Sequence, residues 1–127
     1  MKTELSDGEW VLMNKLWAQA PRTITQLTAA LKEEAGWSKH TIISMLSRLE
    51  AKGAVGYQDS GRAKAYFPVL QRSDAARRET RHFLDKVYEG RLGLMLNAMV
   101  DSQALSQEEI EELSSILERA KGGVDRD

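Results

Sequence analysis

The sequence predicts a mainly α-helical fold with one small β-hairpin near its middle. Apolar residues recur with helical spacing on both sides of a short central segment. In that segment, AVGYQ (54–58) and AKAYFP (63–68) have the β-branched or aromatic composition of strands. We therefore divide the chain into a first domain over residues 1–70 and a second, helical domain over residues 71–127.

The first two helices are marked by capping boxes, in which a hydroxyl residue is followed three positions later by Glu or Gln. The pairs are Ser6 with Glu9 and Thr23 with Gln26. In such a box, each side chain satisfies a backbone N–H group that the first helical turn leaves unpaired. We predict helices in LSDGEWVLMNKLW (5–17) and RTITQLTAALKEEAG (22–36), the second of which ends at Gly36.

The third helix is predicted within GWSKHTIISMLSRLEAKG (36–53), where Ser38 is the N-cap and Gly53 ends the helix. An apolar stripe leaves its other face to short polar and basic side chains. These are Lys39, His40, Thr41, Ser44, Ser47 and Arg48. Solvated helix faces are usually rich in Glu and Lys, whereas hydroxyls and cations near a helix N-terminus suit phosphates and base edges.

The hairpin gives this polar helix face a context. Asp59, Ser60 and Gly61 are predicted to form the turn, which places Arg62 and Lys64 at or beside its tip. Two helices joined by a tight glycine-containing turn form a helix-turn-helix, and a basic hairpin after it makes a winged helix. We therefore predict a DNA-binding domain whose third helix enters the major groove.

The charge distribution agrees with a polyanion contacting only the front of the chain. The net charge is −1, but residues 1–81 hold 13 Lys and Arg against 9 Asp and Glu, whereas residues 82–127 hold 5 against 10. A basic front part and an acidic rear part indicate that only the front part attracts a polyanion. Double-stranded DNA is thus expected to bind the first domain.

The second domain is predicted to contain helices over 73–90, 91–100 and 105–123, with Gly122 and Gly123 ending the last. These short helices carry more Leu and Met than a small isolated lobe can bury. The simplest cover is a second copy of the chain; the alternative is packing against the first domain. The expected dimer interface is Phe83, Leu84, Val87, Tyr88, Leu92, Met95, Leu96, Met99, Ile110, Leu113, Ile116 and Leu117.

The composition argues against several other classes of protein. The absence of cysteine excludes disulfides, thiolate metal sites and cysteine nucleophiles. Two histidines without clustered carboxylates form no catalytic constellation, so we predict no enzyme activity, metal or cofactor. No apolar run approaches the roughly 20 residues of a membrane span. MKTELSDGEW also lacks a secretion signal, so we expect a cytoplasmic protein without membrane insertion.

The chain resembles the penicillinase and methicillin-resistance repressors, the BlaI/MecI family, over essentially its whole length. The segments that carry the resemblance are LSDGEWVLMNKLW, GWSKHTIISMLSRLEAKGAV, GRAKAYFPV, FLDKVYEG and LSQEEIEEL. The resemblance implies a dimeric winged-helix transcriptional repressor that binds a palindromic operator with TACA-type half-sites. It also implies that the C-terminal helices interlock two chains.

The resemblance implies specific DNA contacts as well. Base-reading positions fall on His40, Thr41 and Ser44, and Arg48 contacts a phosphate or a base. Wing contacts to the DNA backbone fall on Arg62, Lys64 and Tyr66. With Ser38 and Lys39 at the start of the third helix, these residues form the predicted DNA-binding set. Family members often carry lysine and threonine in place of His40 and Ser44, so the operator preference stays open.

Members of the family are inactivated by proteolysis in the dimerisation region, triggered by a membrane sensor of β-lactams. The best-known members are cut between Asn and Phe, and the aligned pair here is Ala98 and Met99. The resemblance therefore implies a sensor-linked protease as a partner. Because the asparagine is missing, cleavage stays open, and core packing is the alternative role of Met99.

Two further functions stay open on the sequence alone. A winged helix can bind protein in place of DNA, in which case the polar face of the third helix would tolerate acidic substitutions. A winged-helix regulator can also respond to a small molecule held in an apolar dimer core, although the sequence contains no pocket signature.

Overall fold

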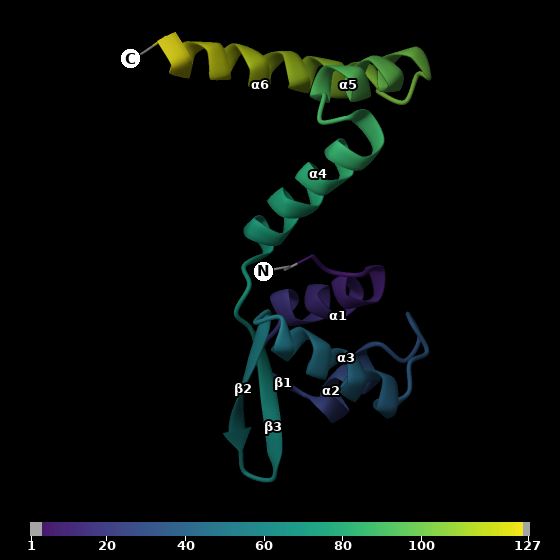
Figure 1. The fold of residues 1–127 in the computed structure, drawn as a ribbon, viewed down its shortest axis with the longest axis vertical. Coiled ribbons are helices and arrows are strands. Elements are labelled where there is room, and N and C mark those ends of the chain that lie inside the picture. Colours follow the sequence, from purple (N-terminus) through teal and green to yellow (C-terminus); the bar gives the residue numbers. More distant parts are fainter. Residues whose placement is uncertain (1–3, 126–127) are drawn as a thin grey trace. The chain divides into compact units, whose positions relative to one another are not determined.

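The computed structural model describes residues 4–125 and consists mainly of helices, with one small antiparallel sheet (Figure 1). The elements are α1 (Asp7–Ala18), β1 (Arg22–Thr23), α2 (Ile24–Ala30), α3 (Lys39–Ala51), β2 (Val55–Ser60), β3 (Ala63–Pro68), α4 (Arg72–Tyr88), α5 (Leu92–Asp101) and α6 (Gln107–Asp125). The chain forms two compact units, an N-terminal unit (Met1–Arg81) and a C-terminal unit (His82–Asp127). The predicted fold class is confirmed.

The predicted caps of the N-terminal unit are present in the structure. Ser6 Oγ accepts a hydrogen bond from the Glu9 N–H at 3.2 Å, and the Glu9 carboxylate accepts one from the Ser6 N–H at 2.8 Å. Ser38 Oγ accepts from the Thr41 N–H at 3.2 Å. These bonds begin α1 and α3 where the sequence predicts, because each one satisfies an otherwise unpaired N–H of the first turn.

The core of the N-terminal unit is built from the apolar stripes of its three helices and the inner side of the sheet. Its fully buried large apolar side chains are Leu12, Met13, Leu16, Leu27, Leu31, Ile42, Leu46 and Leu49. The helices approach closely at Gly8, where an added Cβ would lie 2.7 Å from Met45 Cε. The Trp17 indole N–H donates to the Leu70 carbonyl at 2.9 Å. The chain after the hairpin is thereby tied to α1.

The hairpin of β2 and β3 is longer than predicted and belongs to a three-stranded sheet in the order β1-β3-β2. Ser60 pairs with Ala63, so the turn consists of Gly61 and Arg62, and Asp59 and Ser60 belong to β2. Gly61 has φ of +72°, a conformation that glycine adopts without strain. The turn therefore begins two residues later than predicted, and of the three predicted turn residues the structure confirms Gly61.

Two predicted helix ends are also wrong. α2 ends at Ala30 and not at Gly36. It is followed by a turn in which the Ala35 and Gly36 N–H groups both donate to the Leu31 carbonyl. α6 continues past Gly122 and Gly123 to Asp125. Glycine inside a helix costs only about 1 kcal/mol relative to alanine and does not force an end.

The C-terminal unit has little interior of its own. Among its described residues, Leu84 is the only buried apolar side chain. The exposed large apolar side chains of this unit are Phe83, Val87, Leu92, Leu94, Val100, Ile110, Ile116 and Leu117. No helix within residues 4–125 combines the length and the apolar character that crossing a membrane requires.

Candidate nucleic-acid interface

The exposed face of α3 is the polar face that the sequence predicts. Ile42, Met45, Leu46 and Leu49 are buried on the core side. Opposite them, the exposed residues include Lys39, His40, Ser44, Ser47 and Arg48, and Thr41 is partly buried at the edge. The helix thus presents hydroxyl, imidazole and cationic groups, which can bond to base edges and phosphates.

Ser38 and Thr41 are held together at the start of α3. Their hydroxyl oxygens lie 3.2 Å apart, and Ser38 also accepts the Thr41 N–H. Ser38 therefore has a capping role besides its predicted DNA contact. The bond between the hydroxyls restricts the Thr41 rotamer, which reduces the entropy that a base contact would otherwise remove.

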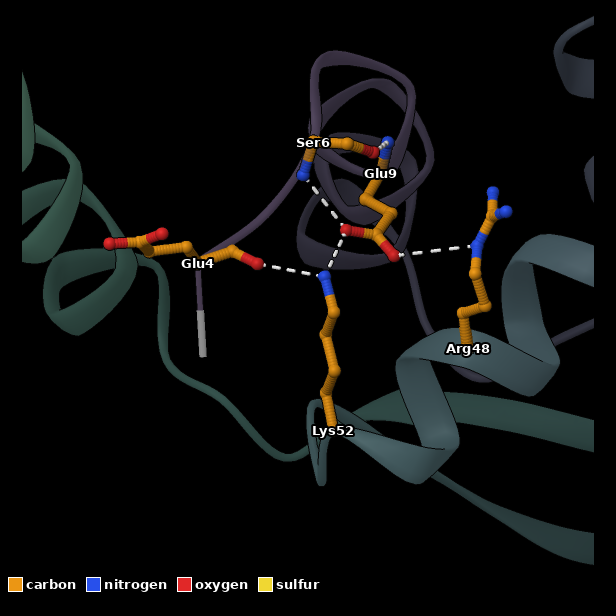
Figure 2. Close-up of polar contacts among 5 residues, drawn as sticks. All are labelled: Glu4, Ser6, Glu9, Arg48 and Lys52. Atoms are coloured by element: carbon orange, nitrogen blue, oxygen red, sulfur yellow. Dashed lines mark hydrogen bonds and ion pairs between the residues drawn. The ribbon is translucent and has the colours of Figure 1, made fainter. Parts of the chain in front are cut away.

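The C-terminal half of α3 is attached to the beginning of α1 through Glu9, which is only 1% exposed. Lys52 Nζ lies 2.6 Å from Glu9 Oε1 and donates to the Glu4 carbonyl at 2.8 Å. Arg48 Nε lies 3.8 Å from Glu9 Oε2, and its terminal nitrogens point away from that carboxylate (Figure 2). Arg48 thus keeps its terminal donors for a phosphate while its Nε faces a fixed negative charge.

The Glu9 carboxylate is charged under ordinary conditions. Burial by itself raises the pKa of this carboxyl, but the hydrogen bonds from Lys52 and from the Ser6 backbone, together with the Lys52 charge, outweigh it and lower the pKa. The carboxylate connects α1 to α3 through Lys52, and loss of either partner would leave a buried charge without compensation.

The wing carries both predicted cations on its outer part. Arg62 is exposed in the two-residue turn, and Lys64 Nζ lies 4.2 Å from the centroid of the Tyr57 ring. Asp59 is directly opposite Lys64 in the sheet register. The Lys64 ammonium nevertheless lies over the Tyr57 ring and forms no ion pair among the described residues. A cation over an aromatic face keeps its charge available to a phosphate.

Tyr66 differs from the other predicted wing residues because it is only 6% exposed. It pairs with Tyr57 across the strands, with ring centroids 5.7 Å apart. Burial raises the pKa of the Tyr66 phenol. Tyr66 thus lies beside Tyr57 on the same face of the sheet, and Tyr57 is the exposed aromatic side chain of the hairpin.

Sequence reasoning missed Tyr57 and the second role of Glu9. Tyr57 could have been found from the hairpin register, because strand alternation places it on the same face as Lys64. The bond between Glu9 and Lys52 joins residues 43 positions apart. No local pattern reports such a contact.

Comparison with known proteins supports the family resemblance that the sequence indicates. A sequence model of the penicillinase repressor family matches residues 5–119. The penicillinase repressor of Bacillus licheniformis is 34% identical over 118 residues, which cover 93% of this chain and 92% of that protein. The methicillin resistance regulatory protein MecI of Mammaliicoccus sciuri is 29% identical over 116 residues, with 91% and 94% covered.

A solved structure is similar in fold. The solution structure of the monomeric form of Bacillus licheniformis BlaI in complex with the blaP half-operator is 32% identical, with a TM-score of 0.50. The similarity covers 56% of this chain and 87% of that one. The resemblance read from the sequence is confirmed, and the chain belongs to the penicillinase repressor family.

Proposed function

We propose that this chain is a transcriptional repressor that binds a palindromic operator as a homodimer and places α3 in the major groove. The observation that carries the proposal is the exposed face of α3, which carries hydroxyls, an imidazole and cations, while the only acidic residue of the helix, Glu50, lies in its last turn. The relative that is 32% identical was solved in complex with a half-operator, which supports DNA as the ligand.

The proposed contacts divide by chemistry. His40, Thr41 and Ser44 lie near the N-terminal end of α3 and are assigned to base edges, because base edges carry the sequence information. The phosphate contacts are assigned to Ser38, Lys39, Arg48, Arg62 and Lys64. Tyr66 is assigned an indirect part in the wing, since its burial leaves little surface for DNA.

The homodimer is proposed from the C-terminal unit. Its described helices expose many large apolar side chains and bury only Leu84. A lobe of this size cannot remain folded with so little interior. The same surface on a second copy would cover it in a two-fold arrangement. Val87, Ile116 and Leu117 are at least 40% exposed in the isolated chain and are assigned to this interface.

Proteolysis between Ala98 and Met99 would release the operator by separating α6 from the preceding helices of the interface. This peptide bond lies inside α5, where the Ala98 carbonyl accepts from the Ser102 N–H at 3.1 Å and the Met99 carbonyl from the Ala104 N–H at 2.8 Å. A protease binds its substrate as an extended chain. A sensor-linked protease would therefore have to unwind the last turn of α5.

The test is binding to a TACA/TGTA palindrome and to a scrambled duplex at three salt concentrations. Thr41→Ala should weaken binding to the palindrome by about fivefold or more, which corresponds to one base contact of roughly 1 kcal/mol. Lys64→Gln should weaken binding to both duplexes and reduce the salt slope by about 0.9 for each phosphate that is no longer neutralised. Ser47→Ala is the matched control, since Ser47 lies on the same face but nearer the C-terminal end.

Salt-sensitive binding that prefers the palindrome and falls in Thr41→Ala would support the repressor. Equal affinity for both duplexes would reject the TACA-type operator. Absence of binding to either duplex at low salt would reject DNA as the ligand. The winged helix would then be tested as a protein-binding module.

A further inference from the structure

One large apolar side chain, Ile43, lies at the edge of the polar face of α3. Ile43 is 42% exposed, although its neighbours on that face carry hydroxyl, imidazole or cationic groups. Among the described residues of the N-terminal unit, the exposed large apolar side chains are Ile43 on α3, Tyr57 on the wing, and Val69 beyond the base of the hairpin. Two of these three lie on the elements proposed to contact DNA.

The position of Ile43 on the helix can be calculated from the 100° rotation per residue. Ile43 lies three residues after His40 and four before Ser47, so it occupies one edge of the exposed face. Arg48 lies on the opposite edge, where its Nε faces Glu9. His40 and Ser44 therefore lie between a cation on one side and a branched apolar group on the other, whereas Thr41 lies beside Arg48.

The major groove contains one kind of apolar group, the C5-methyl of thymine. The polar residues of this face can bond to the other groups on base edges. Single exposed apolar residues are common on protein surfaces and need no function. On this helix, however, the apolar group borders the face that would be dehydrated on binding, where burial of a methyl group adds affinity.

We propose that Ile43 is a specificity-determining residue that contacts the C5-methyl group of a thymine in the operator. The proposal rests on the proposed function, because it requires α3 to lie in the major groove. It gives the chain a preference that does not depend on hydrogen bonding. A thymine would be favoured over a cytosine or a uracil at one position of each half-site.

Deoxyuridine tests this contact directly, because it differs from thymidine only in lacking the methyl group. Each thymine of the TACA/TGTA palindrome is replaced in turn, in both half-sites together. The full-length chain and the variants Ile43→Ala and Ile43→Val are titrated against each duplex. Val69→Ala is the matched control, since it also shortens an exposed apolar side chain of the N-terminal unit.

At one thymine position, replacement in both half-sites should weaken wild-type binding by about 15-fold. This is about fourfold for each of the two methyl groups that lose an apolar contact. Ile43→Ala should bind the thymine and uracil duplexes at that position within about twofold of each other, and Ile43→Val should show an intermediate ratio. Val69→Ala should keep the wild-type ratio.

Three results would overturn the proposal in distinguishable ways. If wild type prefers the palindrome but is insensitive to deoxyuridine at every position, Ile43 contacts no methyl group and the repressor function stands. If Ile43→Ala keeps the full wild-type ratio, another residue makes the contact. If no variant prefers the palindrome over the scrambled duplex, the proposed operator fails together with the inference.

Discussion

The two units of this chain differ in where their apolar side chains lie. The N-terminal unit buries the stripes of α1, α2 and α3 around one core. The C-terminal unit exposes most of its large apolar side chains, and α5 has no buried residue. Both units are helical and both carry amphipathic sequences, so secondary structure alone does not separate them.

An amphipathic pattern therefore predicts a buried face but does not say what covers it. In the N-terminal unit the chain covers its own stripes. In the C-terminal unit we infer that a second copy does so. The first unit would then hold the DNA-binding surface in shape, and the second would set how many such surfaces act together.

The largest expected effect comes from breaking the proposed cover of the C-terminal unit. Leu117→Glu changes a side chain that is 56% exposed in the isolated chain. In the proposed dimer it would bury an unpaired carboxylate, which is strongly unfavourable. We expect a monomer in sedimentation experiments. Operator affinity should decrease by about 100-fold or more, because the two N-terminal units are no longer linked to each other.

Ser115→Glu is the control for this change, because it places the same carboxylate on the opposite side of α6. It should leave the dimer and the operator affinity near wild type. A Leu117→Glu variant that stays dimeric would contradict the proposed interface. A variant that becomes monomeric but keeps full affinity would contradict the link between dimerisation and binding.

An effect of comparable size, on stability and not on DNA binding, is expected inside the N-terminal unit. Leu46→Ala removes a fully buried side chain from α3 and should lower the free energy of unfolding by about 3 kcal/mol. The three tryptophans, Trp10, Trp17 and Trp37, all belong to this unit, so tryptophan fluorescence in urea follows its unfolding.

Ile116→Ala in α6 is the paired change in the C-terminal unit. If the N-terminal unit folds independently of the C-terminal unit, Ile116→Ala should change the free energy of the unfolding transition seen by tryptophan fluorescence by less than about 0.5 kcal/mol. This is the range for substitutions away from a packed core. A large shift for Ile116→Ala would mean that the two units unfold together. The comparison between them would then fail.

The elements that sequence predicts well are those specified by neighbouring residues. Ser6 with Glu9 and the Ser38 cap begin helices because their bonds span three residues, and the structure contains each of them. The helical spacing of the four apolar residues of α3, namely Ile42, Met45, Leu46 and Leu49, likewise predicts its buried face directly. Both signals lie within one or two helical turns, where chain geometry determines which groups meet.

Features that depend on distant residues could not be predicted in this way. β1 is only two residues long and exists because Arg22 and Thr23 pair with Tyr66 and Ala65. The bond of Lys52 to Glu9 depends on how α1 packs against α3. Tyr66 has a residue type suited to a DNA contact, but its burial follows from its place in the sheet. The DNA contacts and the dimer interface remain predictions.

A third effect tests how the proposed DNA-binding surface is held within the N-terminal unit. Glu9→Gln removes the buried charge that Lys52 and Arg48 face. We expect the free energy of unfolding to fall by about 2 kcal/mol at neutral pH, less than for a fully buried pair because both cations can be rehydrated. Glu34→Gln, which breaks the surface pair with Lys15, should cost less than about 0.5 kcal/mol.

The effect of Glu9→Gln should depend on pH in a defined direction. Because folding lowers the pKa of Glu9, its stabilisation is complete above the unfolded pKa of about 4.3 and is lost as the pH falls through the lower folded pKa. Urea unfolding of wild type and variant at pH 7, 5 and 3 should show a difference that is retained at pH 5 and shrinks at pH 3. A difference that grows in acid would contradict the lowered pKa.

The smallest effect concerns the wing, which the N-terminal unit organises by itself. The Tyr57 ring lies under the Lys64 ammonium, so Tyr57→Leu and Lys64→Gln should be coupled in operator affinity. The coupling in a double-mutant cycle should be about 0.5–1 kcal/mol, the range for an exposed cation–π contact. Tyr57→Phe keeps the ring and should retain the coupling.

The same cycle, repeated in the Leu117→Glu background on a half-operator duplex, tests whether the wing depends on the C-terminal unit. The contact lies within β2 and β3, so the coupling for each half-site should be the same in monomer and dimer. Strictly additive effects of the two substitutions would mean that Tyr57 does not position Lys64. A coupling present only in the dimer would mean that the wing depends on the second copy, and the N-terminal unit would then not organise the proposed DNA-binding surface by itself.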